Sequence, residues 1–181
     1  LDTEEDDEIC VGCAGGIDIT MTRSYNLQDS IEDEIYVNII MNGLTGGHSG
    51  AEIHKGLGNS NKILFELIQK LNSDFDVKIC SIDGGGLRNA IPRESSAIIS
   101  FDENNLNSFK KIMKNTSQTL VAEFKETDDN INLEFELLEN RFQTLGAIES
   151  KELINAINEC PNGVFETVSY THLRAHETKR N

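Results

Sequence analysis

The sequence has no tryptophan, only two prolines and a shortage of basic residues. Lys and Arg number 16 against 31 Asp and Glu, which leaves a formal net charge of -15. Such a surface repels phosphate backbones and anionic headgroups, so nucleic acid and membrane are poor partners. No run approaches the roughly 20 apolar residues that a spanning helix needs, and the acidic start LDTEEDDE is unlike a signal peptide. We therefore expect a cytoplasmic protein.

Cysteine is also scarce, because four residues in a chain of 181 do not make a disulfide scaffold. Cys10 and Cys13 have CxxC spacing, but no second Cys or His pair follows at zinc-finger distance. We expect reduced thiols. Small buried cysteines near a turn are the favoured interpretation of the CxxC pair, and a metal or redox role is the alternative.

What the sequence does have is a regular succession of strand and helix patterns from Glu34 onward. Alternating apolar residues predict strands at 35–41, 76–82, 96–101 and 131–138. Apolar residues at helical spacing predict helices at 59–71, about 105–125 and about 147–159. The order β-α-β-β-α-β is typical of a ferredoxin-like α+β fold, in which an antiparallel sheet carries two helices on one face.

Both ends of the chain differ in style from this regular part. Residues 168–181 are rich in basic side chains, and the order from Val168 to Thr178 is that of a translated sequencing adapter. We therefore treat 168–181 as a non-native tail and exclude it from the fold. The first residues carry no initiator Met and run into an acidic stretch typical of a strand end and its loop. We expect the chain to start inside a domain.

The two remaining histidines, His48 and His54, lie in the glycine-rich segment GGHSGAEIHKGLGNSNK. Its Gly56-Leu57-Gly58 opens a predicted helix and would suit a phosphate, but the dinucleotide-binding and Walker patterns are incomplete. Ser49 beside His48 does not define a nucleophilic site, because a triad is recognised by geometry. A metal site of two histidines lacks a helix to align them. The residues alone favour turn or surface histidines.

A resemblance adds to this interpretation. The segments that carry it, in chain order, are LDTEEDDE, GCAGGID, GLTGGHSGAEIHKGLGNSNK and GGGLRNAIPRE. Together they resemble the aminoacyl-histidine (Xaa-His) dipeptidases, also called cytosol non-specific dipeptidases, a branch of the dizinc metallopeptidase superfamily. The resemblance implies that residues 1–33 end the first part of an α/β zinc-peptidase catalytic domain, and that 34–167 are the truncated first part of a lid, or dimerisation, domain.

The resemblance also implies roles for individual residues. In the family two zinc ions activate a water molecule and a glutamate is the general base. Asp2 matches a zinc ligand, and His48 matches the lid histidine that stabilises the developing oxyanion, often in the partner subunit's active site. Asn89 matches an asparagine that hydrogen-bonds the substrate or the tetrahedral intermediate. The alternatives are one more charge of an acidic run for Asp2 and a turn former for Asn89.

The sequence therefore predicts part of a zinc-dependent homodimeric dipeptidase that hydrolyses dipeptides, including Xaa-His, by metal-activated water. Other divalent metals could replace zinc. We expect the chain alone to be inactive, because most zinc ligands and the base are missing from it. The alternative is a stand-alone acidic ferredoxin-like module that dimerises or binds a partner without catalysis.

Overall fold

The computed structural model describes residues 15–29 and 31–164. The predicted zinc ligand Asp2, the CxxC pair and the 168–181 tail lie outside the described residues, so what was predicted for them stays a prediction. The elements are β1 (Glu34–Asn42), β2 (Gly47–His48), η1 (Ile53–Lys55), α1 (Ser60–Asp74), β3 (Lys78–Gly84), β4 (Ala90–Ile91), β5 (Ser95–Asp102), η2 (Glu103–Asn105), α2 (Leu106–Glu123), β6 (Asn132–Leu138) and α3 (Ala147–Glu159).

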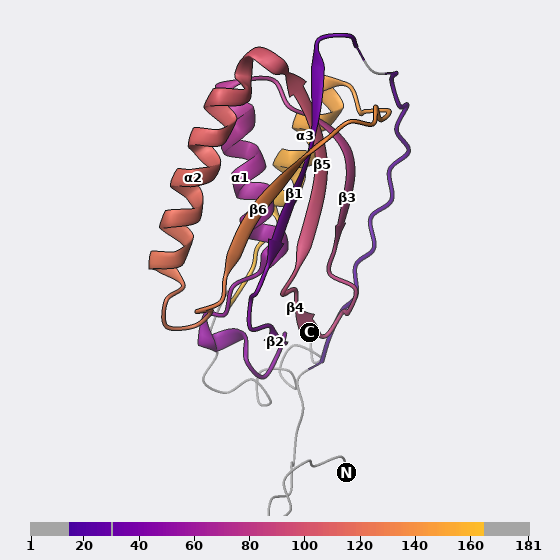
Figure 1. Ribbon diagram of the computed structural model, residues 1–181. Helices are drawn as coiled ribbons and strands as arrows, with labels where there is room; N and C mark the ends of the chain where they lie inside the picture. Colours follow the sequence, from indigo (N-terminus) through magenta and orange to yellow (C-terminus); the bar gives the residue numbers. More distant parts are fainter. Residues whose placement is uncertain (1–14, 30, 165–181) are drawn as a thin grey trace, which may run out of the picture.

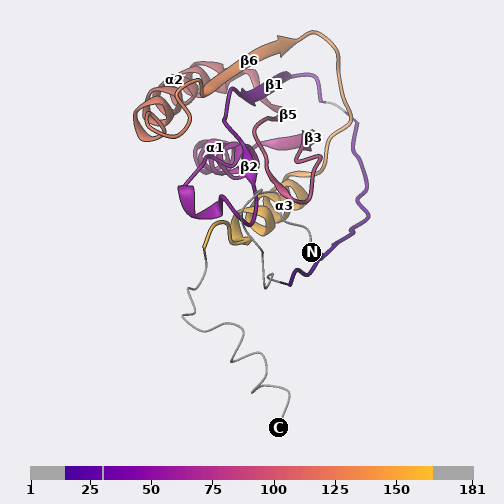
Figure 2. The same cartoon turned by 90° about the horizontal axis from the view of Figure 1, so that it is seen from below.

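The main sheet has the strand order β3-β5-β1-β6, and each neighbouring pair is antiparallel. Figure 1 shows β1 and β5 in the middle of the sheet, and Figure 2 shows α1, α2 and α3 together on one of its faces. The ferredoxin-like α+β fold predicted from the sequence is therefore confirmed. The third helix, α3, lies beside α1.

The core lies between the sheet and the helices because each element presents one apolar face. Val37 and Ile39 of β1 are completely buried, two residues apart as strand alternation requires. Leu64, Ile68 and Leu71 of α1 follow helical spacing and are equally buried. Each such side chain contributes about 1.5–3 kcal/mol when it is fully removed from water.

The start of α1 is fixed by a cap and by a long cation. The Asn59 side chain accepts a hydrogen bond from the Lys62 amide at 3.2 Å, which satisfies one free donor of the first turn. The Lys62 ammonium donates to the carbonyl oxygens of Ile157, Asn158 and Cys160 at 3.2, 2.7 and 2.9 Å. A cation at these carbonyls complements the end of α3 and ties it to α1.

A second, two-stranded sheet stands apart from the main one. β2 and β4 pair in antiparallel fashion below the main sheet in Figure 1. Residues 43–58, which contain β2 and run from the end of β1 to the residue before the Asn59 cap of α1, are called the His48 loop here. Its Gly43 and Gly46 have φ values of 76° and 68°, a left-handed conformation that glycine adopts without a steric penalty.

Candidate functional site

The structure brings the two predicted catalytic residues of the described region together. His48 of β2 pairs with Ala90 of β4, and the Ser49 amide donates to the Asn89 carbonyl oxygen at 2.9 Å. His48, Asn89 and Arg93 all line one open groove of about 710 Å³. Sites for small molecules measure about 300–1,000 Å³. The groove is therefore large enough for a small ligand such as a dipeptide.

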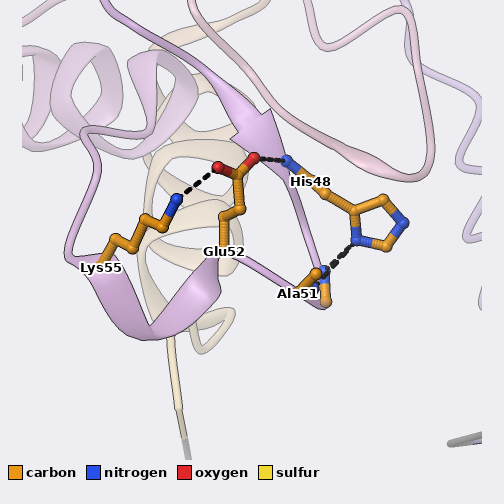
Figure 3. Close-up of polar contacts among 5 residues, drawn as sticks. His48, Ala51, Glu52 and Lys55 are labelled. Carbon is orange, nitrogen blue, oxygen red and sulfur yellow. Dashed lines mark hydrogen bonds and ion pairs between the residues drawn. The ribbon is translucent and has the colours of Figure 1, made fainter. Parts of the chain in front are cut away.

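The imidazole of His48 is held by its own loop. Nδ1 accepts hydrogen bonds from the backbone amides of Gly50 and Ala51, both at 3.0 Å (Figure 3). A neutral imidazole has one acceptor and one donor nitrogen, so a ring that accepts at Nδ1 carries its proton on Nε2. His48 is exposed. Its Nε2–H is therefore a hydrogen-bond donor that a ligand in the groove can reach.

Glu52 completes the turn around His48 (Figure 3). Its Oε2 accepts from the His48 amide at 2.8 Å, and its Oε1 accepts from the Lys55 ammonium at 2.7 Å. The Glu52 amide donates in return to the His48 carbonyl oxygen at 3.0 Å. The hydrogen bond from Lys55, followed by that from the His48 amide, lowers the pKa of the Glu52 carboxyl. The carboxylate is thus kept ionised where it binds the backbone of His48.

Asp128, in the turn between α2 and β6, holds both ends of the His48 loop. Its Oδ1 accepts from the Thr45 amide at 2.8 Å, and its Oδ2 accepts from the Gly58 amide at 2.9 Å. The residue has no exposed surface. Burial acts to raise the pKa of Asp128, but the hydrogen bonds from the backbone of Thr45 and Gly58, together with those from the Thr127 and Thr45 side chains, outweigh it, and the pKa is lowered. Asp128 thereby fixes where the loop leaves and rejoins the fold.

Sequence reasoning missed both Glu52 and Asp128. Ser49-Gly50-Ala51-Glu52 has the S-x-x-E spacing of a capping box, which could have drawn attention to Glu52. The structure shifts that box by one residue, because Glu52 reaches back to the His48 amide and the His48 ring replaces the serine hydroxyl. Asp128 lies 83 and 70 positions from its two partners, so no local pattern announces it.

Two other polar residues of the motifs, to which no catalytic role is assigned, have more ordinary surroundings. Arg88 forms an ion pair with Asp18 at 2.8 Å, and His54 is exposed on η1. Within residues 15–29 and 31–164, no group of three or more His, Cys, Asp or Glu side chains is placed to hold a metal ion. The described residues therefore do not form a zinc site, and the zinc prediction stays a prediction. In the same part of the chain, no helix is long and apolar enough to cross a membrane.

The sequence and the fold of this chain were compared with known proteins, and the matches define its class. Residues 40–128 match the M20 peptidase dimerisation domain. The chain is 36% identical over 164 residues to the cytosol non-specific dipeptidase of Escherichia coli strain K12. The matched region covers 91% of this chain and 34% of that protein. The crystal structure of the aminoacylhistidine dipeptidase from Vibrio alginolyticus matches with a TM-score of 0.77 and 27% identity, over 82% of this chain and 30% of that one.

The resemblance found in the motifs is confirmed, with the M20 peptidase dimerisation domain assigned to residues 40–128. The chain spans about a third of the length of the relatives it matches. The roles of His48 and Asn89 are not assigned by these similarities and stay predictions.

Proposed function

We propose that this chain carries the first part of the lid of a metal-dependent dipeptidase, and that the whole enzyme hydrolyses dipeptides, including Xaa-His, with metal-activated water. The observation that carries the proposal is the meeting of His48 and Asn89 on one groove of an M20 dimerisation domain. Both similar proteins are dipeptidases by name. Residues 1–33 would then end the first part of the catalytic domain, and 34–167 would be the first part of the lid.

His48 and Asn89 would act on the charge that develops during hydrolysis. When water adds to the peptide carbonyl, the oxygen becomes an oxyanion, and a donor already in position stabilises it without reorganisation. The Nε2–H of His48 is such a donor, because Nδ1 is occupied by two backbone amides. Asn89 adds an amide group that can hydrogen-bond the substrate or the tetrahedral intermediate.

Zinc would supply the other half of the chemistry, by lowering the pKa of bound water and polarising the carbonyl. Asp2 is the zinc ligand that the resemblance offers, and the remaining ligands and the general base would come from the catalytic domain. The described residues form no metal site of their own. Every step assigned here therefore belongs to side chains of the lid.

The lid would also set the assembly. We propose a homodimer, as the name of the dimerisation domain suggests, in which His48 can reach an active site of the partner subunit. A histidine on a long loop at the end of the sheet suits a contact with another domain. A cytoplasmic setting agrees with the acidic sequence and with the name of the Escherichia coli relative.

The test compares the chain alone with the full-length enzyme, both assayed with zinc and an Xaa-His dipeptide. We expect no hydrolysis by the chain alone. In the full-length enzyme, His48→Ala should lower kcat about 100- to 1,000-fold, the usual cost of an oxyanion donor, with KM little changed. Exposed His54 is the matched control, and His54→Ala should leave kcat unchanged.

Two outcomes would contradict the proposal. If His48→Ala keeps the full kcat, the histidine does not contact the reacting atoms. If the full-length enzyme with an intact site hydrolyses no dipeptide, the acidic ferredoxin-like dimerisation module becomes the better account of the chain.

A further inference from the structure

The groove holds a histidine whose ring orientation the backbone alone does not fix. Rotation about the side-chain bonds could place either ring nitrogen toward Gly50 and Ala51, and a neutral imidazole exists in two tautomers. In the structure, Nδ1 faces both amides at 3.0 Å. This geometry requires the amides of residues 50 and 51 to point back at the ring, which depends on the sharp turn between His48 and Glu52.

We propose that Glu52 is a positioning residue for His48. Its carboxylate binds the His48 amide and closes the turn, which holds the Gly50 and Ala51 amides on Nδ1 and leaves Nε2–H as the donor toward the groove. The inference deepens the proposed dipeptidase function and rests on it for its catalytic meaning. Glu52 itself does not contact the reacting atoms.

The geometry around Glu52 favours this role over that of an ordinary surface charge. One carboxylate oxygen accepts from the His48 amide and the other accepts from the Lys55 ammonium, so each oxygen has a hydrogen-bond donor within the protein. A bond from an amide to an ionised carboxylate is about twice as strong as a neutral one. The Glu52 amide in turn donates to the His48 carbonyl oxygen, so the two residues are joined by a reciprocal pair of hydrogen bonds. The turn is thus closed from both sides.

Two glycines make room for the arrangement. A Cβ on Gly47 would lie 2.8 Å from Glu52 Oε2, and a Cβ on Gly50 would lie 3.3 Å from His48 Cε1. Both distances are shorter than ordinary van der Waals contacts of carbon. The absence of side chains at positions 47 and 50 therefore lets the carboxylate reach the amide and lets the ring approach the turn.

The tautomer matters because it decides what His48 offers to a substrate. With the proton on Nε2, the ring donates to a developing oxyanion. With the proton on Nδ1, the ring would present a lone pair at Nε2, which repels an oxyanion and suits a metal or a base instead. By closing the turn, Glu52 selects the donor form.

The experiment is nitrogen NMR of the imidazole rings in the 181-residue chain, with the His48 signals assigned from the His48→Gln variant. The unchanged chain should show Nε2 in the protonated range, Nδ1 in the unprotonated range, and a coupling across the hydrogen bonds to the Gly50 and Ala51 amides. Glu52→Ala should lose that coupling and show a second, Nδ1-protonated form of His48.

Two further variants separate positioning from general damage. Glu52→Gln keeps an oxygen that can accept from the His48 amide, so it should restore most of the coupling. Glu94 lines the same groove but follows β4 in the sequence and does not belong to the His48 loop. Glu94→Ala should therefore leave the His48 signals unchanged. Circular dichroism checks that each variant is folded.

Several results would overturn the inference. The same His48 spectrum in a folded Glu52→Ala chain would show that the ring is held without Glu52, and an equal change in Glu94→Ala would show that the effect is not specific. If Glu52→Ala does not fold, the Glu52→Gln chain is measured in its place. Absence of the coupling in a folded Glu52→Gln chain would then decide against the inference. The spectrum does not depend on hydrolysis, so failure of the dipeptidase proposal in the kinetic assay would be recognised separately.

Discussion

Two carboxylates hold the His48 loop, and they differ in almost every physical respect. Asp128 is completely buried and reaches the two ends of the loop from a distant turn. Glu52 belongs to the loop itself, its side chain is 35% exposed, and its partners lie within four residues. One carboxylate joins the loop to the fold, and the other shapes the loop from within.

Because of this difference, the stability of the domain depends on Asp128 more than on Glu52. A buried donor that loses its acceptor has no water to replace it, whereas an exposed donor does. Removing Asp128 should therefore destabilise the whole domain, but removing Glu52 should change the geometry of His48 with little effect on folding. Variants of the two carboxylates and of their neighbours separate these two effects.

Asp128→Ala should cause the largest loss of stability. The change leaves the buried amide of Gly58 and the part-buried amide of Thr45 without acceptors, and a buried unsatisfied donor costs about 1–3 kcal/mol. Chemical denaturation followed by circular dichroism measures the loss. The neighbouring Asp129, which is exposed, is the matched control, and Asp129→Ala should be close to neutral. Equal midpoints for the two variants would show that Asp128 does not hold the loop.

The same carboxyl should make stability depend on pH in acid. Because its pKa is lowered in the folded state, the contribution of Asp128 is complete above the pKa of an unfolded aspartate, about 3.9. It is lost as the pH falls below that value and through the folded pKa. In Asp128→Asn, which cannot ionise, this part of the acid destabilisation should disappear. Denaturation midpoints at several pH values test this, and parallel curves for the two proteins would contradict it.

Most of the fold could be predicted because its strands and helices have strong apolar periodicity. The element boundaries differ where polar contacts decide them. α1 continues to Asp74, beyond the last apolar position of its stripe, because its end is set by the Phe75 amide donating to Leu71. β3 begins at Lys78 and not at 76, because the Val77 amide donates to the Asn72 side chain and not to a neighbouring strand. Apolar spacing carries no information on such bonds.

The candidate site could be predicted only in part. His48 and Asn89 were found from motifs, but their meeting depends on the ladder of β2 and β4, which has two residues in each strand and therefore no periodicity to detect. Glu52 had a weak local signal in the capping-box spacing. Asp128 had none, because its bonds join segments that are distant in sequence. Contacts of this kind arise from the completed fold.

Gly58→Ala should have an intermediate effect and tests how tightly the rear of the loop is packed. A Cβ at this position would lie 2.2 Å from Leu44 Cδ2 and 3.3 Å from Asp128 Oδ2. Overpacking of this kind costs about 1–3 kcal/mol. Gly86, where a Cβ meets nothing within 4 Å, is the control. If Gly58→Ala and Gly86→Ala unfold at the same denaturant concentration, the loop is more adaptable than the structure shows.

Lys55→Met should have the smallest effect on stability, and it tests whether Glu52 positions His48 without the help of Lys55. The substitution removes the ion pair with Glu52, whose two side chains are 49% and 35% exposed, and exposed pairs contribute little to stability. It leaves the hydrogen bond between Glu52 and the His48 amide in place. The unfolding midpoint and the imidazole spectrum of His48 should both stay close to those of the unchanged chain. A Lys55→Met spectrum like that of Glu52→Ala would instead show that the lysine holds the carboxylate in position, and that the unit that positions His48 has two members.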